Sequence, residues 1–275
     1  MRGGTLYLVA TPIGNLGDVT RRCLEVLAQV DLIASESPPA AKRLLSALGL
    51  RGRVVPFREA NREQAARDIL ARLQEGQSVA LLAEAGMPAI SDPGWTLVRA
   101  CHEQGLNVTC VPGASALTVA VALSGLPSRR LCFEGFLPRK GRERREAIEQ
   151  LRGEPRTIVL FEAPHRIRET LADLLAALGD REAFLGREFT KQFETLRLAR
   201  LSNLLEGLEE PRGEYVLVLG PGDATGETPE VDPEWVAFLD EQGLSTRQTA
   251  AILARLTGLP RRQLYQQLLD SSPPD

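Results

Sequence analysis

Along the chain, short apolar runs rich in β-branched residues alternate with longer segments in which apolar positions recur at the helical period. This alternation predicts α/β units around a largely parallel sheet, because each strand is followed by a helix that leads to the next. In the first half, the predicted strands are residues 5–10, 32–35, 53–57, 78–83 and 107–111. The predicted helices are residues 18–30, 40–48, 62–75, 94–104 and 115–124. Residues 1–124 are therefore expected to form an α/β domain.

The composition changes at LSGLPSRR, residues 123–130, where glycine, proline and serine mark a boundary. A second domain is expected over residues 125–221, with strands at residues 131–136, 157–161, 183–189, 195–201 and 215–219. Its predicted helices are residues 142–151, 167–178 and 202–209. The few residues between the third and fourth of these strands favour an antiparallel hairpin, so a mixed-sheet α+β domain is predicted.

The segment PGDATGETPEVDP is dense in glycine, proline and acidic residues, and residues 222–233 are predicted to be a linker. A small unit is expected over residues 234–275, with short helices at residues 233–242, 245–257 and 261–269 and Ser245 as an N-cap. Helix, turn, helix is the pattern. Four arginines and no acidic residue between residues 242 and 269 give this unit a local positive field.

The composition argues against several classes of site but does not by itself indicate a function. The 275 residues include 33 Lys plus Arg and 36 Asp plus Glu, a net charge of −3, so a site for a polyanion must be local. The four cysteines lack CxxC spacing, which favours buried reduced thiols, and with only two histidines no metal site is expected. No signal peptide or membrane span is indicated, so a cytoplasmic location is expected.

Three loops that follow predicted strands carry the candidate chemistry: residues 10–18, 83–94 and 111–116. Open α/β sheets bind ligands at the carboxyl ends of their strands, and no P-loop, dinucleotide fingerprint or nucleophile elbow competes with this reading. Gly14 would let a ligand approach the backbone, and Asp18, Asp92 and Ser115 are candidate helix caps. Each loop taken singly could be a structural turn; three on one edge favour a ligand site.

Seven segments follow one another in the order GTLYLVATPIGNLGDVTRRCLEVL, GMPAISDPG, VPGASA, FEGFLPRK, FEAPHR, REFTKQFE and RGEYVLVLGP. In this order they closely resemble the small-subunit ribosomal RNA 2′-O-ribose methyltransferase I group of the tetrapyrrole methylase superfamily. The resemblance runs from about residue 4 to residue 221, and residues 245–268 resemble the helix-turn-helix extension of the same group. It implies a tetrapyrrole-methylase-like two-domain fold with a small helical C-terminal unit.

The resemblance also implies a homodimer that binds S-adenosylmethionine between its two α/β domains and methylates a cytidine ribose in the decoding region of small-subunit (16S) rRNA, as free rRNA or in the assembled small ribosomal subunit. The three loops would line the cofactor cleft. The candidate cofactor-binding residues are Pro12, Gly14, Asn15, Gly86, Met87, Ile90, Ser91, Asp92, Pro93, Ser115, Ala116 and Glu162.

One segment departs from the family pattern. Where the group has E-D-T-R-H-T after its second strand, this chain keeps Glu36 and continues Ser-Pro-Pro-Ala-Ala. If the missing Arg and His normally contact RNA or move a proton, another residue must do so, and Lys42 and Arg43 are the nearest substitutes.

Methyl transfer to a ribose hydroxyl depends on alignment of oxygen, carbon and sulfur, assisted by a proton acceptor. The candidates for this role are Glu36, Glu162, His165 and Glu188. His165 could instead bond the backbone at a helix start. Glu188 could instead belong to a structural ion-pair cluster with Arg187 and Lys191.

Five positive charges lie within seven residues after a Phe-Leu-Pro turn, at Arg139, Lys140, Arg142, Arg144 and Arg145. They are interpreted as an RNA-phosphate loop or as a solvated helix start, and Arg166 and Lys191 are further RNA-binding candidates. Neutralising Arg144 and Arg145 is expected to weaken rRNA methylation and reduce its salt dependence. Two alternatives remain open: a tetrapyrrole C-methyltransferase, and an RNA-binding factor without turnover.

Overall fold

The computed structural model describes residues 4–91, 94–222 and 233–257, together with residues 261, 264, 265 and 268. The chain forms two compact units, Met1–Gly222 and Asp223–Asp275, and each is described by itself. The first unit contains two five-stranded sheets, and the second contains short helices. In the part of the chain that is described, no helix is long and apolar enough to cross a membrane.

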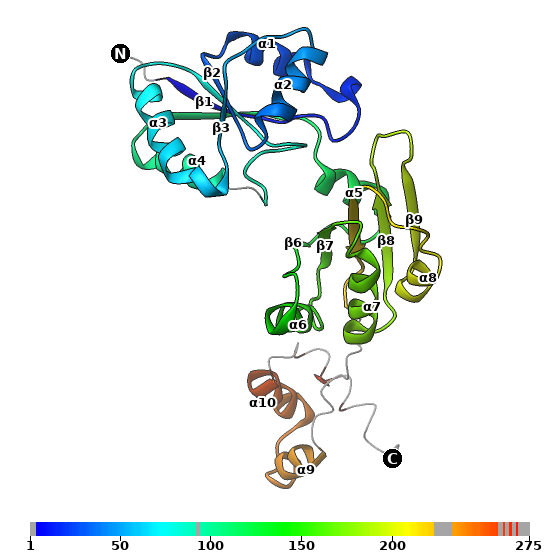
Figure 1. The fold of residues 1–275 in the computed structure, drawn as a ribbon. Helices are drawn as coiled ribbons and strands as arrows, with labels where there is room; N and C mark the ends of the chain where they lie inside the picture. The colour runs from blue at the N-terminus through cyan, green and yellow to red at the C-terminus, as the bar shows by residue number, and fades with distance from the viewer. Residues whose placement is uncertain are drawn as a thin grey trace. The chain divides into compact units, whose positions relative to one another are not determined.

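The first sheet is entirely parallel, with strand order β3-β2-β4-β1-β5. Its strands are β1 (Thr5–Val9), β2 (Leu32–Ser35), β3 (Val54–Pro56), β4 (Val79–Leu82) and β5 (Asn107–Val111). The central strands are buried on both faces, as their continuous apolar runs require. Helices α1 (Arg21–Gln29) and α2 (Pro38–Ala47) cover one face, and α3 (Arg62–Gln74) and α4 (Trp95–Glu103) cover the other (Figure 1).

This strand order decides where the loops meet. Strand β1 lies between β4 and β5, with Leu8 paired to Leu81 on one side and to Cys110 on the other, and β2 lies next to β4. The carboxyl ends of parallel strands share one edge of a sheet, so the loops after β1, β4 and β5 are neighbours there. The sequence placed these loops at strand ends, and the topology brings them together.

The second sheet is mixed, with strand order β6-β7-β10-β8-β9. Its strands are β6 (Leu131–Phe136), β7 (Thr157–Glu162), β8 (Glu182–Arg187), β9 (Thr195–Arg200) and β10 (Tyr215–Leu219). Only β6 and β7 pair in parallel, and β8 and β9 form the predicted antiparallel hairpin. Helices α6 (Gly141–Gln150), α7 (Ile167–Leu178) and α8 (Leu201–Glu206) pack on one face of this sheet.

Helix α5 (Ala116–Ser124) covers the opposite face of the second sheet. The sequence prediction grouped this helix with the first sheet, since it follows β5 directly. Its sequence, ALTVAVALS, is apolar on nearly every side, and Ala120 is fully buried in a cluster with Phe184 and Val218. Gly125 ends the helix in the left-handed conformation, with φ of 68°. The predicted domain boundary between residues 124 and 125 stays a prediction, although α5 packs against the second sheet.

The helix caps differ in part from the prediction. Asp18 does not cap the first helix; Thr20 does, because its side chain accepts a hydrogen bond from Cys23 N at 3.1 Å. Asn15 caps the preceding 3₁₀ turn, Leu16–Asp18, by accepting from Gly17 N at 2.9 Å. Ser115 occupies the N-cap position of α5, but its side chain makes no capping hydrogen bond. The Ser115 hydroxyl is therefore not committed to the helix.

In the second unit, α9 (Pro233–Glu241) and α10 (Thr246–Thr257) contribute to a small apolar core around Leu239, Ala250 and Leu253. Gln248 Oε1 accepts hydrogen bonds from the Ser245 backbone and hydroxyl at 2.9 and 2.7 Å, so the predicted cap position is stabilised through Gln248. The predicted linker 222–233 and third helix 261–269 lie largely outside the described residues.

The cysteines are all free thiols. Cys23 and Cys101 are buried, and burial raises the pKa of both, that of Cys101 to about 11. They are therefore protonated at neutral pH and act as apolar core side chains, as predicted. Cys110 and Cys132 were also expected to be buried but are only half-buried. Among the described residues, no group of three potential metal ligands comes together.

Candidate active site

A cavity of about 550 Å³ lies between the carboxyl edge of the first sheet and the ends of β7, β8 and β10. We call it the large cavity. Its apolar lining comes from loops of the first sheet, through Ile13 and Met87, and from α5 and the second sheet, through Leu117, Phe136 and Phe161. The further lining residues are Glu36, Glu84, Ala85, Gly86, Ile90, Ser91, Ser115, Ala116, Glu162, Ala163, Pro164, His165, Glu188, Phe189, Glu214, Tyr215 and Val216.

The large cavity collects most of the residues that the sequence selected. All four candidate proton acceptors line it: Glu36, Glu162, His165 and Glu188. So do seven of the cofactor-binding candidates, namely Gly86, Met87, Ile90, Ser91, Ser115, Ala116 and Glu162, the last of which is a candidate for both roles. Asp92 and Pro93 lie outside the described residues. Their roles as ligand contacts remain predictions.

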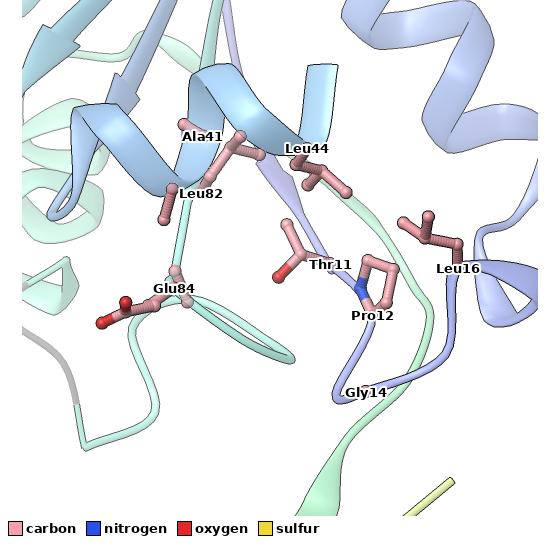
Figure 2. Close-up of a pocket in the computed structure, with 10 residues that line it drawn as sticks. Thr11, Pro12, Gly14, Leu16, Ala41, Leu44, Leu82 and Glu84 are labelled. Atoms are coloured by element: carbon pink, nitrogen blue, oxygen red, sulfur yellow. The ribbon is translucent and has the colours of Figure 1, made fainter. Parts of the chain in front are cut away.

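Three residues of the first loop lie elsewhere. Pro12 and Gly14 line a separate pocket of about 180 Å³, which we call the small pocket (Figure 2). Asn15 lines neither space; its side chain caps the 3₁₀ turn. Within this loop, Ile13 faces the large cavity while its two neighbours face the small pocket, so the loop forms a wall between them.

The charge of the large cavity is one-sided. Five carboxylates line it and, among its described lining residues, there is no lysine or arginine. Glu162 is paired with Arg166, and Glu188 and Glu214 are paired with Lys191. The side chains of Glu36 and Glu84, at the ends of β2 and β4, make no hydrogen bond or ion pair within the described residues. An apolar-walled cavity with two unpaired carboxylates suits a cationic ligand.

Glu162 is held too tightly to be the best proton acceptor. Its side chain is buried, and Oε1 accepts from Ala163 N at 2.9 Å and lies 3.4 Å from Arg166 Nε. Oε2 accepts a short hydrogen bond from the Thr170 hydroxyl, at 2.6 Å. Because both oxygens are engaged by the protein, the geometry favours a structural role in which Glu162 fixes the loop that carries His165.

The expectation that Arg144 grips phosphate needs correction, because its side chain is buried. Arg144 Nε pairs with Asp173 at 2.9 Å, Nη2 donates to the Thr170 hydroxyl at 2.9 Å, and Nη1 donates to Pro138 O at 3.2 Å. Thr170 in turn donates to Glu162. Arg144 therefore stabilises Glu162, a residue of the cavity wall, through Thr170. Its guanidinium group is buried and is not available to bind RNA.

The side chain of Arg166 is also directed into the protein. Its Nη2 donates to the carbonyls of Leu137 and Pro138 at 2.9 and 3.1 Å, and its side chain is 13% exposed. The expectation of a phosphate contact is therefore weakened for Arg166 as well. The other basic candidates on α6 and the turn before it are exposed, as are those on α2; they are Arg139, Lys140, Arg142, Arg145, Lys42 and Arg43.

Glu188 and Lys191 form an ion pair of 2.8 Å, and Glu214 N donates to Glu188 Oε1 at 3.0 Å. Burial raises the pKa of Glu188, but the hydrogen bonds from Lys191 and Glu214 N and the nearby positive charge lower the pKa more, so its net shift is downward. A carboxyl with a lowered pKa is a weaker proton acceptor. His165, in contrast, is exposed at the cavity and makes no hydrogen bond within the described residues.

Replacing Lys191 by methionine is expected to remove about 1 kcal/mol of stability near pH 7, because Glu188 loses its partner. Since the pKa of Glu188 is held below its ordinary 4.5, this contribution is present above pH 4.5 and is lost as the pH falls through the native value. Urea unfolding of both proteins between pH 7 and 3 should show two stabilities that converge in acid. A constant difference across this range would contradict the assignment.

Gly14 is required for a reason that differs from the prediction. A Cβ atom at this position would lie 2.4 Å from Lys191 Cγ and 2.8 Å from the Phe189 carbonyl oxygen. The missing side chain therefore lets two protein loops approach each other, and the expected approach of a ligand to this backbone stays a prediction. This contact joins the loop after β1 to the loop after β8, and both loops contribute residues to the lining of the large cavity.

Gly14→Ala is accordingly expected to destabilise the protein by about 1–3 kcal/mol, the usual cost of overpacking. Gly153→Ala is the matched control, because a Cβ there meets no atom within 4 Å and the backbone φ is not positive. Thermal unfolding of both variants measures the difference. Equal melting temperatures for the two would show that the loops separate without cost.

Sequence reasoning missed several lining residues; those with polar or aromatic side chains are Glu84, Phe136, Phe161, Phe189, Glu214 and Tyr215. Glu84 had a signal, since it follows a predicted strand just as Glu36 does. Tyr215 and Phe136 had none, because only the pairing of β10 with β7 and β8, and of β6 with β7, brings the second sheet's ends to the cavity.

Comparison with known proteins places this arrangement in a family. The profile of the Tetrapyrrole (Corrin/Porphyrin) Methylases matches residues 5–205, and that of the RsmI C-terminal HTH domain matches residues 237–272. A protein of Escherichia coli O157:H7 named ribosomal RNA small subunit methyltransferase I is 41% identical over 272 residues, which cover 97% of this chain and 95% of that one. The protein of the same name from Synechocystis is 43% identical and covers 97% and 98%.

The chain belongs to the ribosomal RNA small subunit methyltransferase I group of tetrapyrrole methylases. The expected family is thus confirmed, and this methylase also has the expected fold. A uroporphyrin-III C-methyl transferase from Thermus thermophilus, solved with S-adenyl homocysteine, matches it with a TM-score of 0.57 at 22% identity, over 79% of this chain and 97% of that one. Diphthine synthase matches with a TM-score of 0.58 at 17% identity, over 78% and 89%.

Proposed function

We propose that this methylase transfers a methyl group from S-adenosylmethionine to the 2′-hydroxyl of a cytidine ribose in small-subunit rRNA. The observation that carries the proposal is the large cavity, in which Glu36 and Glu84 present unpaired carboxylates inside a methylase fold. The relatives named ribosomal RNA small subunit methyltransferase I, which match nearly the whole chain, support rRNA as the substrate. The motifs of the 2′-O-ribose group support the ribose hydroxyl as the acceptor.

The residues present fit a sulfonium donor. The cavity of about 550 Å³ falls in the range of sites that enclose ligands of this size, and its apolar walls with few polar groups are typical of such sites. The cavity carries no lysine or arginine among its described lining residues, so nothing there opposes a positive sulfur. Glu36, Glu84 and the Ser115 hydroxyl are the groups that would hold the donor.

When bound, S-adenosylmethionine would supply a methyl group on a positive sulfur, and a base of the protein would have to accept the proton of the ribose hydroxyl that receives the methyl. His165 is the acceptor that the geometry favours, since its ring is free and exposed at the cavity. Glu162 fixes the loop that carries His165, and Glu188 stays ionised beside Lys191. Glu36 remains a second candidate, because its carboxylate is also unpaired.

Contact with RNA is assigned to exposed cations outside the cavity. Arg139, Lys140 and Arg145 lie at the start of α6, and Lys42 and Arg43 lie on α2. Phosphates approach such side chains without entering the acidic cavity, which would repel them. The proposal also includes the expected homodimer, the assembled small ribosomal subunit as a possible form of the substrate, and a cytoplasmic location.

The decisive experiment incubates the purified full-length protein with methyl-labelled S-adenosylmethionine and small ribosomal subunits from cells that lack this modification. Label on a ribose of the rRNA, mapped by nuclease digestion, supports the proposal. Label on an added porphyrinoid instead of RNA would favour the tetrapyrrole C-methyltransferase alternative. RNA binding without label would favour a non-catalytic factor.

A further inference from the structure

Phe136, the last residue of β6, lines the large cavity but has none of the roles assigned above. Its side chain is among the exposed large apolar groups of the protein, at 56% exposure. Among the described residues, its ring contacts one other ring, that of Phe161, edge to face with 5.7 Å between centroids and 65° between planes. Much of the Phe136 ring is therefore uncovered at the cavity, where it is free to stack on a planar ligand.

A β-bulge directs the Phe136 side chain to this face of the sheet. The pairing of β6 with β7 shifts by one residue between Phe133 and Gly135, and Gly135 adopts a positive φ of 63°. Side chains alternate between the two faces of a strand, so without this shift Phe136 would lie opposite Phe133, on the face covered by α6 and α7. Bulges that redirect a side chain in this way are common next to active sites.

The turn after Phe136 is bonded to the loop that carries His165. Arg166 follows His165 directly, and its Nη2 donates to the carbonyl oxygens of Leu137 and Pro138 at 2.9 and 3.1 Å. Strands β6 and β7 pair in parallel, so both segments follow strand ends at the same edge of the sheet. The exposed ring and the favoured proton acceptor are therefore held at one edge of the large cavity by direct hydrogen bonds between their loops.

Two exposed cations follow the turn. Arg139 and Lys140 make no hydrogen bond or ion pair within the described part of the chain. Arg142, in contrast, is paired with Glu146 at 2.5 Å. Phosphates of a nucleic acid bind exposed cations of the first kind without displacing a partner. An uncovered aromatic ring followed directly by free cations is typical of sites that stack a base and bind its backbone.

We propose that Phe136 stacks on the base of the nucleotide to be methylated and that Arg139 and Lys140 bind the phosphates that flank it. This inference rests on the proposed function and adds the group that holds the acceptor. Enzymes that act on a nucleotide take its base out of the stack, and an aromatic ring in the site replaces the lost stacking. A base on Phe136 brings its ribose to the edge of the cavity that carries His165, the favoured proton acceptor.

The donor also contains a planar group, its adenine, but the charges favour the acceptor at Phe136. Glu36 and Glu84, the carboxylates that suit a cationic donor, follow β2 and β4 of the first sheet. Phe136 belongs to the second sheet and is followed by cations, which repel a sulfonium and attract phosphate. The two ligands are therefore assigned to different sides of the cavity lining.

The test measures methylation of small subunits that carry either cytidine or an abasic ribonucleotide at the mapped position. The abasic residue keeps the 2′-hydroxyl and both phosphates but has no base to stack. Phe136→Leu keeps an apolar side chain without a ring, and Phe136→Tyr keeps the ring. Phe193→Leu is the matched control, because Phe193 is 69% exposed and does not line the cavity.

At saturating S-adenosylmethionine, Phe136→Leu should lower kcat/KM for the cytidine subunit about tenfold, since stacking on the ring is lost. Removal of the base should lower kcat/KM of wild type by a similar factor, and Phe136→Leu should then change it less than about twofold for the abasic subunit. Phe136→Tyr and Phe193→Leu should keep the wild-type values. Calorimetric affinity for S-adenosylmethionine and the melting temperature should stay unchanged in all three variants.

The phosphate contacts are tested separately. Replacing both Arg139 and Lys140 by glutamine should reduce the slope of log affinity for rRNA against log salt by about two, one for each lost contact. Arg51 and Arg53, exposed residues before β3, are the control pair; replacing both by glutamine changes the net charge equally and should leave the slope unchanged. Equal slopes for the two double variants would refute these contacts.

Three results would overturn the stacking. Equal losses of Phe136→Leu with the cytidine and abasic subunits would show that the ring supports the protein and not a base. A lower affinity of Phe136→Leu for S-adenosylmethionine would place the donor's adenine on the ring. Unchanged methylation of cytidine by Phe136→Leu would show that neither ligand stacks there. In these three cases wild type still labels the cytidine subunit and the proposed function stands; if wild type binds S-adenosylmethionine but labels neither subunit, the proposed function itself fails.

Discussion

Replacing both Glu36 and Glu84 by glutamine is expected to weaken the binding of S-adenosylmethionine about 100-fold. Glutamine keeps the shape of each side chain, so the change removes charge with little effect on packing. If each carboxylate attracts the positive sulfur with about 1.4 kcal/mol, each substitution lowers the affinity by a factor of about ten. Neither carboxylate has a cationic partner among the described residues, so a bound cation would not have to displace one.

The reaction product provides the internal control for this prediction. S-adenosylhomocysteine carries a neutral thioether in place of the sulfonium, so its affinity should change less than threefold in the same variant. Isothermal calorimetry with both ligands measures the two effects. A double variant at Glu63 and Glu206, exposed residues on α3 and α8, changes the net charge equally and should leave both affinities unchanged. Equal losses for donor and product would show that the carboxylates act on shape or hydration and not on the positive sulfur.

Arg144→Met and Arg145→Met are expected to have opposite consequences, although the two residues are adjacent. Arg144→Met should lower the free energy of unfolding by about 3 kcal/mol, toward the low end for a broken buried ion pair because Asp173 is 40% exposed. Thr170 loses a donor, Pro138 O loses its hydrogen bond and Asp173 loses its counter-ion. The loop behind Glu162 loosens, so activity should fall as well.

Arg145→Met should leave stability within about 0.5 kcal/mol, because its side chain is exposed. It should instead reduce the slope of log affinity for rRNA against log salt by about one, the value for one lost phosphate contact. Urea unfolding and filter binding at several salt concentrations separate the two effects. A stable Arg144→Met variant with a reduced salt slope would restore Arg144 as an RNA contact and refute the network described here.

Local patterns were sufficient for the elements that depend on a few neighbouring residues. Strands at residues 32–35, 107–111, 131–136 and 215–219 have the predicted bounds, since their apolar runs end at polar or turn-forming residues. The bounds of several helices shifted by one to three residues, as at the first helix, where a 3₁₀ turn precedes the Thr20 cap. Short-range hydrogen bonds decide at which residue a helix begins and ends, and these bonds can be predicted only in part from residue types.

The sequence predicted which loops carry the candidate residues, but it did not predict which of their side chains line one cavity. Glu36, His165 and Ser115 were selected because each follows a strand, and the structure places all three at one cavity. Arg144 and Arg145 could not be distinguished by spacing, because a helix turns adjacent residues by about 100° and only the packing against α7 shows which side is buried. Gly14 likewise gave no sign that Lys191 would lie against it.

By itself, the sequence determined the alternation of strands and helices, the loops that carry chemistry and the family, because periodicity and ordered motifs are properties of contiguous residues. The tertiary structure alone decided the strand order, the packing of α5 on the second sheet and the burial of Arg144. It also decided that Glu36 and Glu84 remain unpaired at the edge of one cavity. These features depend on contacts between residues far apart in the chain, and such contacts form only where burial of apolar surface brings the segments together.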